Sequence, residues 1–144
     1  MTSTGARLLT TGPRLYRAAR RAGASPGDAA GVLSVSLLAL VTAAAGSPRR
    51  PGRRNAQRHF SWQACLTARY GADVARAVGN EHERGSSRPE DSAVDRHNNE
   101  VGRRYGAEHA DALRGMPVRV AVGHLCTVAD GLWRSGELRV VEPR

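Results

Sequence analysis

The chain has 144 residues, a formal net charge of +9 and an apolar fraction of 40%. This length and composition suffice for one modest hydrophobic core rather than two. Only six residues are aromatic, too few for a β-sandwich, whereas abundant Ala, Val and Leu suit closely packed helices. We therefore predict an all-α fold, a small bundle of four to five helices with an additional apolar N-terminal helix.

The positive charge is concentrated at the N-terminus. All 22 basic residues are arginine, a bias that resembles the codon usage of a GC-rich genome more than selection for phosphate binding. Residues 1–54 contain nine arginines and one acid, whereas residues 55–144 contain thirteen arginines and twelve acids. The second region is therefore nearly neutral, which argues against a nucleic-acid partner.

Residues 1–46 combine a basic leader with an apolar segment, and residues 29–46 contain no charge. Three interpretations remain open. The segment is a cleaved secretory signal, a membrane anchor, because eighteen helical residues span roughly 27 Å, or a core helix capped by Ser25 and ended by Gly46. Secretion or an envelope location with a membrane partner at 29–46 is preferred, and a cytoplasmic protein is the alternative.

An Arg/Pro-rich linker is expected over residues 47–54, followed by a helical domain over 55–144. The two cysteines, Cys65 and Cys126, fall on separate predicted helices. They would pair in an oxidising compartment and would remain small buried thiols in a reducing one.

The first helix of this domain is predicted over residues 55–71, with Asn55 as its cap and Gly71 as its stop. Trp62 lies three positions after His59 and so shares its face. The next predicted helix runs from Ala72 to about Glu83 and places His82 at a helix-to-loop edge, where binding groups tend to be exposed.

A third helix is predicted over residues 90–106 and carries an unusual polar stripe. Asp91, Asp95 and either Asn98 or Asn99 are spaced so that they follow one side of the helix. Two carboxylates one turn apart repel each other unless a cation lies between them. Asparagine inside a helix is also locally unfavourable, so we expect tertiary contacts or a ligand to hold this stripe.

The C-terminal region is predicted to continue with helices, including residues 118–133, where apolar residues recur at near-helical spacing. The alternation over residues 136–141 fits either a short strand or an extended tail.

Three blocks together resemble a bacterial helical domain family of unknown function: Asn55-Ala56-x-Arg58-His59-x-x-Trp62, His82-Glu83 and Asp95-x-x-Asn98-Asn99-x-x-Gly102-Arg103. The resemblance covers about residues 50–140. It implies a helical fold with a polar pocket and no settled reaction, and it is associated with secreted, toxin-like or envelope proteins and with short stand-alone proteins. The chain departs from the family pattern at Arg96-His97, where an aliphatic residue is expected, which affects local packing.

Imidazoles and carboxylates are the groups that Zn²⁺ and other divalent ions bind. Our first hypothesis is a metal-assisted hydrolase of an anionic substrate, a phosphodiester or a lipid. In it a divalent ion is the cofactor and Glu83 is the general base. Arg58 or Arg103 meets the substrate. The expected metal ligands are His59, His82, Asp91 and Asp95.

The alternative is a non-catalytic envelope or toxin-associated binding module. In it the same residues form a structural polar network, with the arginines neutralising the aspartates. Trp62, Asn98 and Asn99 contact substrate in the first hypothesis and tie helices together in the second.

Overall fold

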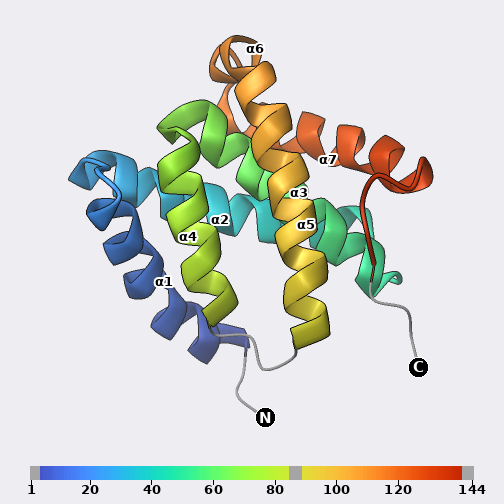
Figure 1. The fold of residues 1–144 in the computed structure, drawn as a ribbon, viewed down its shortest axis with the longest axis horizontal. Coiled ribbons are helices and arrows are strands. Elements are labelled where there is room, and N and C mark those ends of the chain that lie inside the picture. The colour runs from blue at the N-terminus through green and yellow to red at the C-terminus, as the bar shows by residue number, and fades with distance from the viewer. Residues whose placement is uncertain (1–3, 85–88, 141–144) are drawn as a thin grey trace.

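The computed structural model of the protein describes residues 4–84 and 89–140, with side chains described from residue 11 to 84 and from 92 to 140. These ranges contain seven helices and no strand (Figure 1). The predicted all-α fold with an apolar helix near the N-terminus is confirmed. The helices are α1 (Thr4–Arg21), α2 (Pro26–Gly46), α3 (Pro51–Tyr70), α4 (Ala72–Arg84), α5 (Pro89–Glu108), α6 (Ala110–Arg114) and α7 (Val118–Arg134).

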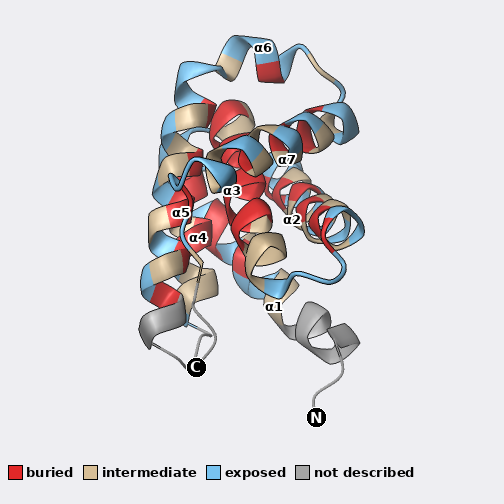
Figure 2. Ribbon diagram, turned by 90° about the vertical axis from the view of Figure 1, so that its right-hand side faces the viewer, coloured by how far each residue is buried: buried red, intermediate tan, exposed pale blue. Residues whose placement is uncertain are grey.

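Helix α3 lies at the centre of the molecule. It contacts α2, α4, α5, α6 and α7, and every residue from Phe60 to Ala68 is buried (Figure 2). Polar side chains on this helix, such as His59 and Gln63, are therefore buried as well. Buried polar groups need partners, and the neighbouring helices supply them.

The predicted ends of α2 are confirmed. Ser25 is its N-cap and accepts a hydrogen bond from the Asp28 backbone N–H at 3.1 Å, with proline in the first turn. The helix ends at Gly46. Side-chain capping of the first turn and the proline at position 48, directly after the Ser47 C-cap, are both local properties, which explains why the sequence predicts the two ends.

The start of α3 differs from the prediction. The helix begins at Pro51 rather than at Asn55, so residues 51–54 of the expected linker are helical. Proline is well suited to the first helical position because its fixed φ already matches the helix. Asn55 consequently lies inside the helix, and its side chain is free for a tertiary contact.

Two glycines bring α5 close to α3. A Cβ atom at Gly102 would lie 2.6 Å from the Phe60 carbonyl oxygen, and one at Gly106 would collide with the carbonyl of Ala64. A larger residue at either position would push the helices apart. The glycines therefore fix the distance and register at which the polar side chains of the two helices meet.

Helix α2 is long and apolar enough to cross a membrane by length and composition alone. In the structure it contacts α1, α3 and α7. One stripe along it is buried: Ala29, Val32, Val35, Ala39 and Ala43. A hydrogen bond of 2.8 Å from Trp62 Nε1 to Ser36 Oγ also ties it to α3.

After α7 the chain makes a turn at residues 135–136 and continues without a strand to residue 140, so the strand alternative for 136–141 is wrong over the described residues, and residue 141 lies outside them. Asn98 on α5 holds this tail by two hydrogen bonds of 2.9 Å, one to the Arg139 carbonyl and one from the Arg139 N–H. Leu138 is buried beside it. Asn98 therefore anchors the C-terminal segment.

Cys65 and Cys126 are both free thiols in the structure. Burial raises the pKa of each thiol, so both are protonated and unreactive at neutral pH. The structure thus shows two packing residues and no disulfide between α3 and α7.

Candidate metal centre

Helices α3 and α5 face each other through a ladder of polar pairs. The two partners of each pair are 40 residues apart in the sequence. The two helices therefore run parallel and keep one register over two turns. The donor–acceptor distances are 2.7 Å for Asn55 Nδ2 to Asp95 Oδ1, 2.8 Å between His59 Nδ1 and Asn99 Oδ1, and 2.8 Å for Arg103 Nη1 to Gln63 Oε1.

His59 is the middle member of the ladder and is fully buried. Because Asn99 presents a carbonyl oxygen to Nδ1, that nitrogen carries the proton and donates it. Nε2 then carries a lone pair, which accepts a hydrogen bond from Arg58 in the metal-free protein. It faces Asp95 Oδ2 at 3.3 Å and Arg58 Nη2 at 3.1 Å. A lone pair and a carboxylate oxygen facing each other form an arrangement that a cation stabilises.

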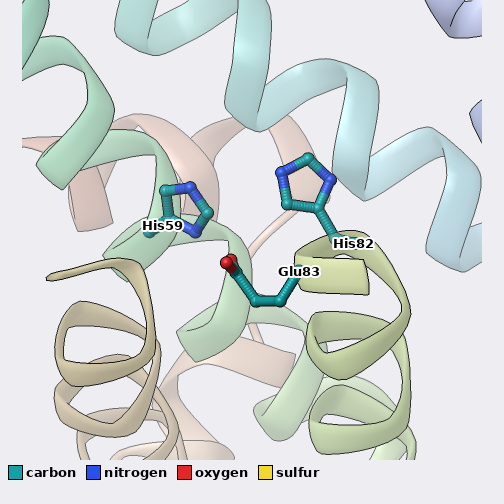
Figure 3. Close-up of side chains that lie close together, drawn as sticks. All are labelled: His59, His82 and Glu83. Carbon is teal, nitrogen blue, oxygen red and sulfur yellow. The ribbon is translucent and has the colours of Figure 1, made fainter. Parts of the chain in front are cut away.

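Helix α4 contributes two more candidate metal ligands, His82 and Glu83, next to His59. The ligand atoms of His59, His82 and Glu83 all lie within 4.8 Å of one another, and Figure 3 shows the Glu83 carboxylate extending toward His59. Burial, followed by the charges of His59 and Arg58, lowers the pKa of His82 to about 4. His82 is therefore neutral at physiological pH and has a lone pair to offer to a metal ion.

The Glu83 carboxylate is the least satisfied group in this cluster. Both of its oxygens are buried, and neither makes a hydrogen bond of good geometry in the part of the chain that the structure describes, although Ser92 lies close enough to favour the ionised form. Burial, followed by the nearby charge of Asp95, raises the pKa of Glu83. A buried carboxylate without a partner is costly unless a cation or a proton neutralises it.

Asp95 behaves in the opposite way. Burial opposes its ionisation, but the close contact with His59, the hydrogen bond from Asn55 and the charge of Arg58 hold the pKa of Asp95 below its ordinary value. The cluster thus contains one carboxyl whose ionised form is stabilised and one, Glu83, whose ionised form is disfavoured by burial and by Asp95.

Trp62 fixes both imidazoles. Its indole meets the His59 ring edge-on at 5.9 Å between centroids and the His82 ring edge-on at 5.3 Å. Because Nε1 is bonded to Ser36, the indole cannot rotate without breaking that contact. Edge-to-face contacts of this kind orient aromatic rings, and here they hold two candidate ligands.

The remaining predicted site residues lie elsewhere or have other partners. Arg103 bonds to Gln63 and, at 2.8 Å, to Glu100 rather than to Asp95. Asn98 holds the C-terminal tail. Asp91 belongs to α5, but its side chain lies outside the described residues. Arg58 does reach the cluster and also donates to Asn55 at 3.1 Å.

Sequence reasoning missed Asn55 and Gln63 as partners of the polar stripe. Asn55 is predicted from the sequence as a cap, and Gln63 is not among the predicted site residues. Their spacing was the available signal, since they precede and follow His59 by four residues and so extend its face by one turn in each direction.

Two surface hollows of the described residues, one beside Tyr105 and Leu132 and one beside Asp28 and Tyr70, include none of the residues of the cluster. His59 is fully buried, whereas His82 and Glu83 are partly exposed. Access from solvent therefore comes from the α4 side.

The fold and the cluster define an all-α domain with a candidate centre for a divalent metal ion. The model of a family described as a domain of unknown function, DUF6973, matches residues 32–120. The chain belongs to this family, and the expected membership in a family of unknown function is confirmed. The matched range begins within α2 and includes all of α3 to α6. No curated protein and no solved structure matches the chain.

Proposed function

We propose that this domain binds a divalent transition-metal ion through His59, His82 and Glu83 and uses it to hydrolyse an anionic substrate, a phosphodiester or a lipid. The observation that carries the proposal is the convergence of the His59 and His82 imidazoles and the Glu83 carboxylate, whose buried oxygens make no hydrogen bond of good geometry among the described residues. Two imidazoles and a carboxylate suit Zn²⁺ and neighbouring ions. Three protein ligands leave a coordination position for water, as hydrolytic sites require.

The surroundings of His59 support this assignment. Metal-binding imidazoles commonly donate their second N–H to a carbonyl or carboxylate oxygen, which fixes the tautomer. Asn99 Oδ1 accepts such a bond from Nδ1, which directs Nε2 toward the other donors. The lowered pKa of His82, about 4, keeps this imidazole neutral at physiological pH, so it too has a lone pair for the ion.

Each residue has a role in this proposal. A bound ion would lower the pKa of a coordinated water and polarise the substrate. Asp95 Oδ2, 3.3 Å from Nε2, lies where it can accept a proton from such a water. Arg58 has donors to offer a phosphate once its contact with Nε2 is released. Glu83, expected from the sequence to be the base, becomes a ligand here.

A structural polar network is the second candidate. It is favoured by the complete burial of His59 and by protein atoms near both of its ring nitrogens. In that case the cluster stabilises a binding module associated with the envelope or with a toxin, and its residues hold no ion.

Metal titration of the full chain separates the two candidates. We expect the chelator-treated protein to bind Co²⁺ or Zn²⁺ in a 1:1 ratio, with a rise in melting temperature that Glu83→Gln abolishes. Glu100→Gln removes the same charge from an exposed ion pair with Arg103 and should leave binding intact. The loaded protein should then hydrolyse a nitrophenyl phosphodiester. Failure to bind any ion, with Glu83→Gln simply changing stability, would support the network.

We also propose that α2 remains part of the mature domain instead of being cleaved. The family match begins at residue 32, and Ser36 holds the indole that orients both imidazoles. Cleavage after α2 would remove the hydrogen-bond partner of Trp62 and the buried stripe that packs on α3. Mass spectrometry of the protein from its native host should therefore show α2 still attached, whether the protein is in the envelope or in the cytoplasm.

A further inference from the structure

Helix α2 packs its smaller side chains inward and several larger ones outward. The buried stripe consists only of alanine and valine. On the opposite side Leu37 is 50% exposed and Val41 is 56% exposed. Leu40 is only partly buried and lies outside the core cluster. A helix that serves only as a core element has the reverse arrangement, with its largest apolar residues in the core.

The outward residues form a continuous stripe. Leu33, Leu37, Leu40, Val41 and Ala44 follow one another at intervals of three, four and one residues, which is one face of a helix. Leu33 is partly covered by the core, so the stripe is most exposed at its centre. Figure 2 shows α2 at the edge of the ribbon, with exposed and buried patches alternating along it.

Exposed arginines precede and follow α2 in the chain. Arg17 and Arg21 lie in the last turns of α1, and Arg49 and Arg50 follow the end of α2. Arg17, Arg49 and Arg50 take part in no ion pair within the described part of the chain, whereas Arg21 has a long contact with Glu81, at 3.9 Å. An apolar helix face with exposed arginines directly after the helix is complementary to the acyl boundary and the anionic headgroups of a bilayer.

We propose that the outer face of α2 docks on an anionic membrane surface, with the helix lying in the plane of the interface. This inference is independent of the metal centre. It differs from a membrane-spanning anchor because the inner stripe of α2 stays packed on α3 and Ser36 stays bonded to Trp62. A spanning helix would have to leave α3. Its own buried residues, such as Val32 and Val35, and the core residues that they cover would then be exposed.

Vesicle binding by the full chain tests the proposal. We expect co-sedimentation with vesicles of phosphatidylcholine containing phosphatidylglycerol, at least about tenfold weaker binding to phosphatidylcholine alone, and release by high salt. Leu37→Asp with Val41→Asp should reduce binding at least tenfold. Arg49→Gln with Arg50→Gln should also weaken it, most strongly at low salt.

Val120→Asp is the matched control, because Val120 is 55% exposed on α7 and the substitution adds the same kind of charge. It should reduce binding less than the α2 pair does, and circular dichroism should show that all variants remain helical. Equal losses for Val120→Asp would overturn the proposal, as would binding that resists high salt and alkaline extraction, which indicates a spanning helix. If Leu37→Asp with Val41→Asp dissociates a dimer and leaves vesicle binding unchanged, the proposal is wrong and this face binds a second copy of the chain.

Discussion

Nδ1 of His59 donates to Oδ1 of Asn99 across 2.8 Å, and this bond determines which nitrogen of a fully buried imidazole carries the proton. It leaves the lone pair on Nε2, the nitrogen that faces Asp95 and the α4 donors. One amide on α5 thus controls the chemistry of a ring on α3. The pairs Asn55–Asp95 and Gln63–Arg103 hold the same two helices one turn to either side.

Asn99→Ala should weaken both the fold and the metal site. The buried Nδ1–H loses its acceptor, which costs about 1–3 kcal/mol of stability. The imidazole also loses its orientation, which typically lowers metal affinity roughly 10–100-fold. Urea unfolding in chelator measures the first effect and Co²⁺ titration the second. If only stability changes and the ion binds as tightly as before, His59 is not a ligand.

Arg58→Gln should bind a divalent ion more tightly than the natural protein, by roughly tenfold, because a positive charge next to Nε2 competes with the ion. Isothermal titration calorimetry measures the change. Arg119→Gln, which removes the same charge from an exposed position on α7, should have little effect. Unchanged or weaker binding by Arg58→Gln would mean that Arg58 does not occupy the cation position in the metal-free protein.

The stability of the metal-free protein should decline as the pH falls from about 6.5 to about 4. Burial, followed by the neighbouring charges of His59 and Arg58, lowers the pKa of His82 from 6.5 in the unfolded chain to about 4 in the fold. The unfolded chain therefore binds more protons in this window, which favours unfolding as the pH falls. Denaturant midpoints across the window measure the effect. The decline should be smaller in His82→Gln, and an identical decline in both proteins would refute the assignment.

Gly102→Ala should destabilise the fold by about 1–3 kcal/mol, because its methyl group would press on the Phe60 carbonyl and force α5 away from α3. Gly123→Ala on α7 is the control, since nothing lies within 4 Å of its added Cβ. Removing a helical glycine there should stabilise the protein by roughly 0.5–1 kcal/mol. Chemical denaturation compares the two variants. Equal effects would show that Gly102 does not set the distance between α3 and α5.

Local sequence properties determined most of the secondary structure. Ser25 capped α2 as expected, Gly71 ended α3 with a φ of 92°, and the scarcity of aromatic residues matched an all-helical fold. The polar stripe of α5 was also visible, because a helical period places Asp95 and Asn99 on one side whatever they contact.

Only the tertiary structure decided which stripe residues meet. The close approach at Gly102 and Gly106 sets the register between α3 and α5. In this register Asn99 lies next to His59, whereas Asn98 faces the C-terminal segment and bonds to Arg139. No local signal distinguishes these two neighbouring asparagines. The position of Glu83 beside His59 likewise depends on how α4 packs, because the two residues are brought together by contacts between helices and not by spacing along one.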